Sequence, residues 1–464
     1  MSASPPHSRL TEGAVGKTLL VFSLPILGSN VLQSLNGSVN SIWVGRYLGS
    51  VALTATSNAN TVMFFLISMV FGVGMAGAIM VGQAMGGRDV ERAKRVVGTS
   101  ASFFILVSIG ISVLGFAFSP QLLRMMRTPA DALPYAVSYL RVVFVAMPFI
   151  FSYAFVVMML RGAGDARTPL LFSVLCVGLD IALNPLLIFG AGPLPRLGVA
   201  GSAASTLIAN AVSLAALVVY LYRKKHALCL RGSELAYLRI DRVLVGALVK
   251  KGLPMGLQMI VMTSSAIVMF ALVNGFGTDT AAAFGAALQV WNYIQMPAFS
   301  IGMAASAMAA QNVGAGHWDR VGQVAKAGVT INLLLTGTLA TLIFVFDRSA
   351  LGLFLTEPAA IAVGVHLNGI VIWSFVLFGV SMVLSSVVRT TGAVLPPLAI
   401  LFVSQWLLRI PFAVAMLGAW GAEAIWWSFS LGSAVSVVLS IAYYRYGGWR
   451  SARMVAAPLA PARP

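Results

Sequence analysis

One acidic side chain stands deep inside an apolar stretch of this sequence. Asp180 lies about eleven residues into the segment that begins near Pro169, whereas the other twelve of the 13 carboxylates fall in loops or near segment ends. Asn184 follows four residues later, so the two side chains share one face of a helix. A carboxylate in an apolar setting can take up and release a proton, or attract Na⁺ or an organic cation. These two residues predict a cation site.

A structural alternative for Asp180 is an ion pair. Arg141 lies about nine residues into the fourth apolar segment, at a depth that could approach that of Asp180. Such a pair would offset the cost of both membrane charges and would leave Asp180 static. Arg141 could instead extend its charge to the membrane surface. The sequence leaves these alternatives open.

The second half of the chain has no matching deep acid. Its polar candidates for lining a substrate cavity are Gln258, Gln289, Asn292, Tyr293, Gln295, His366 and Asn368. Amides also hold helices together, so hydrogen bonding between helices is the alternative for them. The imidazole of His366 could titrate near neutrality, although a lone histidine in a helix can also serve only in packing.

Proline in an apolar segment predicts a kink. Pro25 removes a backbone donor from the first segment, and a bend there is a candidate gating motion, with a static kink as the alternative.

The composition of the chain is that of a membrane protein, so membrane helices are expected to position these residues. The chain has 464 residues, of which 59% are hydrophobic and only 9% charged, against about 25% charged in a soluble domain. A span needs about 20 apolar residues. Twelve segments qualify: 18–45, 51–82, 96–118, 132–160, 169–190, 197–222, 245–275, 281–311, 323–346, 359–388, 397–417 and 421–444. The sequence predicts an all-α membrane protein of twelve helices.

Basic residues orient these helices. With the N-terminus inside, 23 of the 30 Lys and Arg fall in inner segments, and six, Arg409 among them, fall in outer loops. This asymmetry predicts that both termini are cytoplasmic. The net charge of +17 then reflects topology, and no nucleic-acid partner is expected.

A sequence repeat divides the chain into two halves. Gly74, Gln83 and Arg161 recur 228 positions later as Gly302, Gln311 and Arg389. Matching halves in so apolar a chain are typical of secondary transporters. The expected organisation is a cytoplasmic segment 1–17, a six-helix bundle 18–222, a cytoplasmic linker 223–244, a second bundle 245–444 and a cytoplasmic tail 445–464.

Motifs along the whole chain resemble one transporter family. They read LPILGSNVLQSLNGSVNSIWVGRYLGSVAL (24–53), GQAMGGRDVERAKR (82–95), RGAGDARTP (161–169), LDIALNPLLIFG (179–190) and LGVAGSAAST (197–206). In this order they resemble the multidrug and toxin extrusion (MATE) family of the multidrug/oligosaccharidyl-lipid/polysaccharide flippase superfamily. The seventh segment has no acid, which resembles the DinF-like branch. The resemblance implies two parallel six-helix bundles around a V-shaped cleft, and export by alternating access.

The resemblance also adds neighbours to Asp180. Asn40, Tyr139 and Thr206 fall where family members build a cation site, which implies possible Na⁺ ligation by Asp180, Asn184, Asn40 and Thr206. The chain departs from the family at two points: position 40 is Asn where Asp is common, and Asp180 and Asn184 stand in the reverse of the usual order. One carboxylate remains, enough for one proton or one monovalent cation.

The resulting hypothesis is an exporter of small amphipathic or cationic drug-like compounds in a bacterial inner membrane. It would work as a monomer, by H⁺ or Na⁺ antiport, with no cofactor. The alternative within transport is a lipid-linked saccharide flippase, which the twelve helices and Arg141 as the only internal basic residue disfavour. An intramembrane enzyme would need clustered catalytic groups, and a channel would need a filter motif; neither pattern occurs in the sequence.

Overall fold

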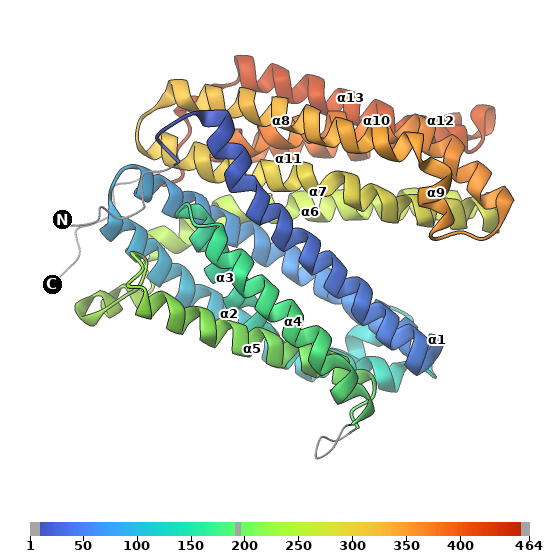
Figure 1. Cartoon of the computed structure of the whole chain (residues 1–464), viewed down its shortest axis with the longest axis horizontal. Coiled ribbons are helices and arrows are strands. Elements are labelled where there is room, and N and C mark those ends of the chain that lie inside the picture. The colour runs from blue at the N-terminus through green and yellow to red at the C-terminus, as the bar shows by residue number, and fades with distance from the viewer. Residues whose placement is uncertain (1–9, 191–195, 456–464) are drawn as a thin grey trace. The chain divides into compact units, whose positions relative to one another are not determined.

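The computed structural model describes residues 10–190 and 196–455, and helices make up nearly all of that part of the chain. Figure 1 traces them by colour from the blue α1 to the red α13. Parts of the expected terminal segments, residues 1–9 and 456–464, lie outside the described residues. The helices are α1 Val15–Gly86, α2 Val90–Met125, α3 Leu133–Gly162, α4 Arg167–Phe189, α5 Val199–Arg223, η1 Gly232–Leu238, α6 Arg242–Asn274, α7 Thr278–Gly314, α8 Trp318–Val345, α9 Asp347–Gly352, α10 Pro358–Arg389, α11 Leu395–Phe402, η2 Val403–Arg409, α12 Ile410–Trp420, α13 Glu423–Tyr446 and η3 Gly448–Ser451.

The described residues contain eleven helices that are long and apolar enough to cross a membrane. The remaining expected span is α7, a helix of 37 residues whose apolar sequence is interrupted by Gln289, Asn292 and Gln295. No strand occurs in the described part of the chain. The predicted all-helical membrane fold is confirmed.

The first two expected spans, 18–45 and 51–82, correspond to two helical spans within α1, Val15–Gly49 and Ala55–Gly86. The only non-helical backbone inside α1 is at Gly49, with φ 87° and ψ 177°, a conformation open to glycine because it lacks Cβ. Pro25 lies within the helical backbone upstream of this break.

The chain divides into two compact units. One contains residues 28–252 and is called the N-terminal unit below; the other contains residues 1–27 and 253–464 and is called the C-terminal unit. The chain passes between them inside α1, after Leu27, and inside α6, after Gly252. Each crossing lies two residues or fewer from a proline, Pro25 or Pro254.

In the N-terminal unit, α3 packs against both α2 and α5, and α5 packs against α4. Phe144 and Phe151 of α3 are among the side chains buried in its core. Gly115 of α2 permits close packing, because a Cβ there would lie 2.0 Å from the Phe144 ring. The segment between the two bundles is also packed, since Lys94 of α2 forms an ion pair with Glu234 of η1.

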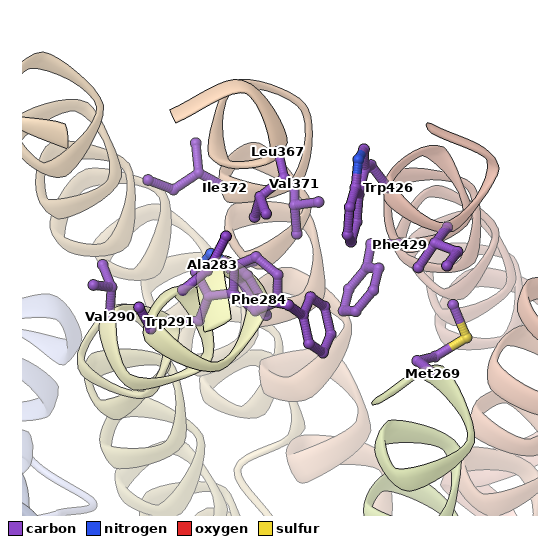
Figure 2. Close-up of a cluster of buried hydrophobic side chains, with 14 of the residues drawn as sticks. Met269, Ala283, Phe284, Val290, Trp291, Leu367, Val371, Ile372, Trp426 and Phe429 are labelled. Carbon is purple, nitrogen blue, oxygen red and sulfur yellow. The ribbon is translucent and has the colours of Figure 1, made fainter. Parts of the chain in front are cut away.

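In the C-terminal unit, α10 packs against α7, α8 and α13. Figure 2 shows the aromatic core that joins three of these helices. The rings of Phe284 and Trp426 stack with centroids 5.8 Å apart, and those of Trp291 and Phe429 lie 5.3 Å apart. Each aromatic pair contributes about 0.5–1.5 kcal/mol beyond area burial.

Candidate functional site

Asp180 is buried in the N-terminal unit among neutral hydrogen-bond donors. Its side chain is 1% exposed. Oδ2 accepts from the amides of Asn36 at 2.7 Å and Asn40 at 3.2 Å, and Oδ1 accepts from the Ser205 hydroxyl at 2.6 Å. The Thr206 hydroxyl lies 3.3 Å from both oxygens. All four donors are neutral, so none of them offsets the charge that the carboxylate carries when it is ionised.

The start of α4 and its contact with α5 place these groups. Asp165 accepts from the backbone N–H of Arg167 at 3.1 Å and of Thr168 at 3.0 Å, which caps α4. At the other end, α5 approaches α4 so closely that a Cβ on Gly201 would lie 2.5 Å from the Leu187 carbonyl oxygen. This approach brings the hydroxyls of α5 to the carboxylate of α4.

Two amide oxygens beside Asp180 lack hydrogen-bond partners. Asn184 is fully buried, and its amide donates to Asn40 Oδ1 and, at 3.4 Å, to the Ser202 hydroxyl. Within the described parts of the chain, nothing donates to Oδ1 of Asn184 or to Oδ1 of Asn36, and both atoms are buried. Buried polar atoms normally have partners, and carboxylate and amide oxygens suit hard cations. The arrangement fits Na⁺ or a proton on Asp180.

Two further predicted neighbours are engaged elsewhere. Tyr139 donates its hydroxyl to Asn60 Oδ1 at 3.3 Å rather than to Asp180. The guanidinium of Arg141 lies 5.1 Å from the centroid of the Phe116 ring. The ion pairs of the described residues do not include Asp180, so the static pair with Arg141 is absent.

The candidates of the second half do not form one cluster. Gln258 is buried and accepts from Arg389 at 2.7 Å. Gln289, Asn292 and Tyr293 are exposed on α7. His366 is also exposed and lies 3.1 Å from Glu423, so the imidazole pairs with an acid near the start of α13.

Sequence reasoning missed Asn36, Ser202 and Ser205. Asn36 precedes Asn40 by four residues, and Ser202 and Ser205 lie on the same face of α5 as Thr206. Once Asn40 and Thr206 were chosen as site residues, the helical spacing could have identified these three neighbours.

Two buried arginines correct the sequence interpretation of the second half. Arg409 does not lie in an outer loop: it ends η2 in the interior of the span from Leu395 to Trp420 and is 7% exposed. Arg389 is 4% exposed. Arg141 is therefore not the only internal basic residue, which removes one argument against a flippase.

Asp347 is a second buried carboxylate that the sequence did not single out, because it lies between two spans. It is 5% exposed and accepts from the Asn368 amide at 2.7 Å. Asn368 in turn accepts from the Trp291 indole N–H at 2.7 Å. These two hydrogen bonds connect α9 to α10 and α10 to α7.

The MatE family model matches residues 25–186 and again residues 254–415. The two matches are equally long, in agreement with the sequence repeat.

Curated relatives and solved structures agree with this match. The probable multidrug resistance protein YoeA of Bacillus subtilis is 37% identical over 438 residues, covering 94% of this chain and 95% of the relative. The probable multidrug resistance protein YpnP of the same organism is 33% identical, covering 96% and 98%. A MOP-superfamily transporter from Pyrococcus furiosus shares the fold with a TM-score of 0.87 at 21% identity, covering 96% and 98%. The chain belongs to the MatE family of membrane transporters, and the resemblance seen in its motifs is confirmed.

Proposed function

We propose that the protein exports small amphipathic or cationic drug-like compounds from the cytoplasm in exchange for H⁺ or Na⁺, with Asp180 as the coupling group. Its membership of a transporter family and the multidrug-resistance names of YoeA and YpnP support drug export. The observation that carries the coupling role is the buried carboxylate, held by neutral donors and flanked by two amide oxygens without partners.

The site holds one carboxylate, so one monovalent cation is exchanged in each transport cycle of the proposed mechanism. A buried charge in a membrane is costly, and a bound proton or Na⁺ neutralises it. The occupied site can therefore change conformation more readily than the empty one. One monovalent cation moved through 100 mV supplies about 2.3 kcal/mol, which drives uphill movement of the drug.

The remaining parts of the proposal concern setting and motion. The protein works as a monomer in a bacterial inner membrane, with both termini cytoplasmic and no cofactor. Bending of α1 near Pro25 contributes to alternating access, which the crossing between units at Leu27 supports.

Everted membrane vesicles test the function. Ethidium uptake is followed by fluorescence under an imposed proton gradient, with and without Na⁺, for wild type, Asp180→Asn and Asp279→Asn. Asp279 is an exposed acid in the first turn of α7, so its variant is the matched control. Wild type and Asp279→Asn accumulate ethidium, and Asp180→Asn loses gradient-driven uptake. Uptake by Asp180→Asn at the wild-type rate would remove Asp180 from the coupling role.

A further inference from the structure

Arg409 carries a positive charge in the interior of a membrane span without an acidic partner. Nη1 donates to Gln405 Oε1 at 2.7 Å, and the guanidinium stacks on Phe429 with its central carbon 3.4 Å from the ring centroid. None of the ion pairs of the described residues involves Arg409. A guanidinium is not deprotonated in proteins, so the charge persists and is only partly compensated by the ring and the amide.

Two donors of this guanidinium are unused. Nε and Nη2 of Arg409 are buried, and no atom in the described parts of the chain accepts from them. Buried charges are normally paired, and an unpaired one in a membrane is expensive. The two free N–H groups form part of the planar fork with which arginine binds carboxylate or phosphate through two parallel hydrogen bonds.

The backbone that ends at Arg409 departs from the regular α-helix. Residues Val403–Arg409 form a π-helix, a rare geometry that is frequently found at functional sites within helices. Gly432 of α13 lets that helix approach: a Cβ there would lie 3.2 Å from the Ser404 carbonyl oxygen and 3.3 Å from the Arg409 Cβ. Three elements take part, since Ser265 of α6 also donates to Gln405, at 3.4 Å.

A small cavity, lined by more apolar than polar surface, lies along α6 and α13. It has a volume of about 30 Å³, and its polar lining is Gln258, Ser381, Ser385 and Ser436. Leu401, which also lines it, precedes Gln405 by one helical turn. Gln258 accepts from Arg389 and has a buried amide nitrogen without a partner among the described residues.

The two units bury opposite charges inside membrane spans, Asp180 in the N-terminal unit and Arg409 in the C-terminal unit. We propose that Arg409 binds an oxyanion, the carboxylate or phosphate group of an amphipathic ligand, in the C-terminal unit. Both groups share the two-oxygen geometry that the free N–H groups fit. This inference does not rest on coupling by Asp180.

Binding to purified protein tests the proposal. The probe is fluorescein, an amphipathic anion, and binding is followed by anisotropy for wild type, Arg409→Gln, Arg409→Lys and Arg141→Gln. Arg141 is the matched control because it is also a membrane arginine stacked on a phenyl ring. We expect Arg409→Gln to weaken fluorescein binding ~tenfold or more, Arg409→Lys to retain part of it, and Arg141→Gln to bind like wild type. Ethidium binding stays unchanged in Arg409→Gln.

Two measurements complete the test. Inorganic phosphate should compete with fluorescein on wild type, relative to chloride at equal ionic strength, which needs no variant to fold. Native mass spectrometry then compares phosphatidylglycerol retained by wild type and Arg409→Gln: loss in the variant assigns the oxyanion to a lipid headgroup, and equal retention assigns it to a soluble ligand. The proposal is overturned if wild type does not bind fluorescein, if phosphate does not compete, or if Arg409→Gln binds like wild type. Loss of ethidium uptake in Asp180→Asn with fluorescein binding intact would separate the two sites.

Discussion

Asp180 and Asp347 are both buried carboxylates, but their surroundings differ. Asp180 accepts hydrogen bonds from four side chains, whereas Asp347 accepts one, from Asn368. Asp347 lies outside the membrane spans, and burial raises the pKa of its carboxyl from 3.8 to about 6, with the bond from Asn368 opposing part of the rise. The carboxyl of Asp347 therefore stays protonated to a higher pH than an exposed aspartate does.

Replacing Asp347 by Asn should change how stability depends on pH. Because the folded pKa is raised, the folded state binds more protons than the unfolded state between about pH 4 and pH 6, so stability falls as pH rises through that window. We expect the unfolding temperature of wild type to fall by up to about 3 °C more than that of Asp347→Asn. Thermal unfolding of both proteins at pH 4.5, 6 and 7.5, followed by tryptophan fluorescence, measures this. The prediction is contradicted if the unfolding temperatures of wild type and Asp347→Asn change equally with pH.

Helical spacing predicted only part of the site at the residue scale. Asn184 could be placed beside Asp180 because four residues separate them, and the family resemblance supplied Asn40 and Thr206. The contacts of Asn36 and Ser205 with Asp180 were not predicted, because the register between two helices is set by side-chain packing and not by the sequence period of either helix. Arg409 was misplaced because a charge is expected at a membrane surface, and its contacts with Phe429 and Gln405, which partly offset its burial, cannot be read from the sequence.

At the scale of elements, the contact between α4 and α5 controls the site. Gly201 sets the distance between these helices, since a Cβ at that position would meet the backbone at Leu187 and Ile188. The helices themselves were predictable from apolar run lengths, including most of their ends. The two spans of α1 were also predictable, and the kink at Gly49 separates them.

Gly201→Ala should separate α5 from α4. The added methyl would lie 2.5 Å from a carbonyl oxygen, so the backbone must shift. We expect a loss of about 1–3 kcal/mol in the free energy of unfolding, together with weaker ion-coupled transport as Ser205 moves away from Asp180. Gly178→Ala on α4 is the control, because nothing lies within 4 Å of its added Cβ. Thermal unfolding measures the loss of stability, and ethidium uptake measures the loss of transport. Equal stability and uptake in Gly201→Ala and Gly178→Ala would show that the contact between α4 and α5 is not tight.

At the scale of the whole molecule, two halves of one family fold bury opposite charges. Both halves match the same family model, yet the N-terminal unit buries Asp180 inside a span and the C-terminal unit buries Arg409 inside another. The division into halves was visible in the sequence, but the crossing of α1 and α6 between units was not, because it depends on which helices pack together.

The central claim, that Asp180 carries the coupling ion, is tested most directly in proteoliposomes. Purified wild type and Asp180→Asn are reconstituted, and ethidium accumulation is measured under a proton gradient alone and a Na⁺ gradient alone. We expect wild type to accumulate ethidium above its external concentration with one of these gradients, and Asp180→Asn only to equilibrate it. Accumulation by Asp180→Asn to the wild-type ratio would contradict the claim and place coupling elsewhere in the chain.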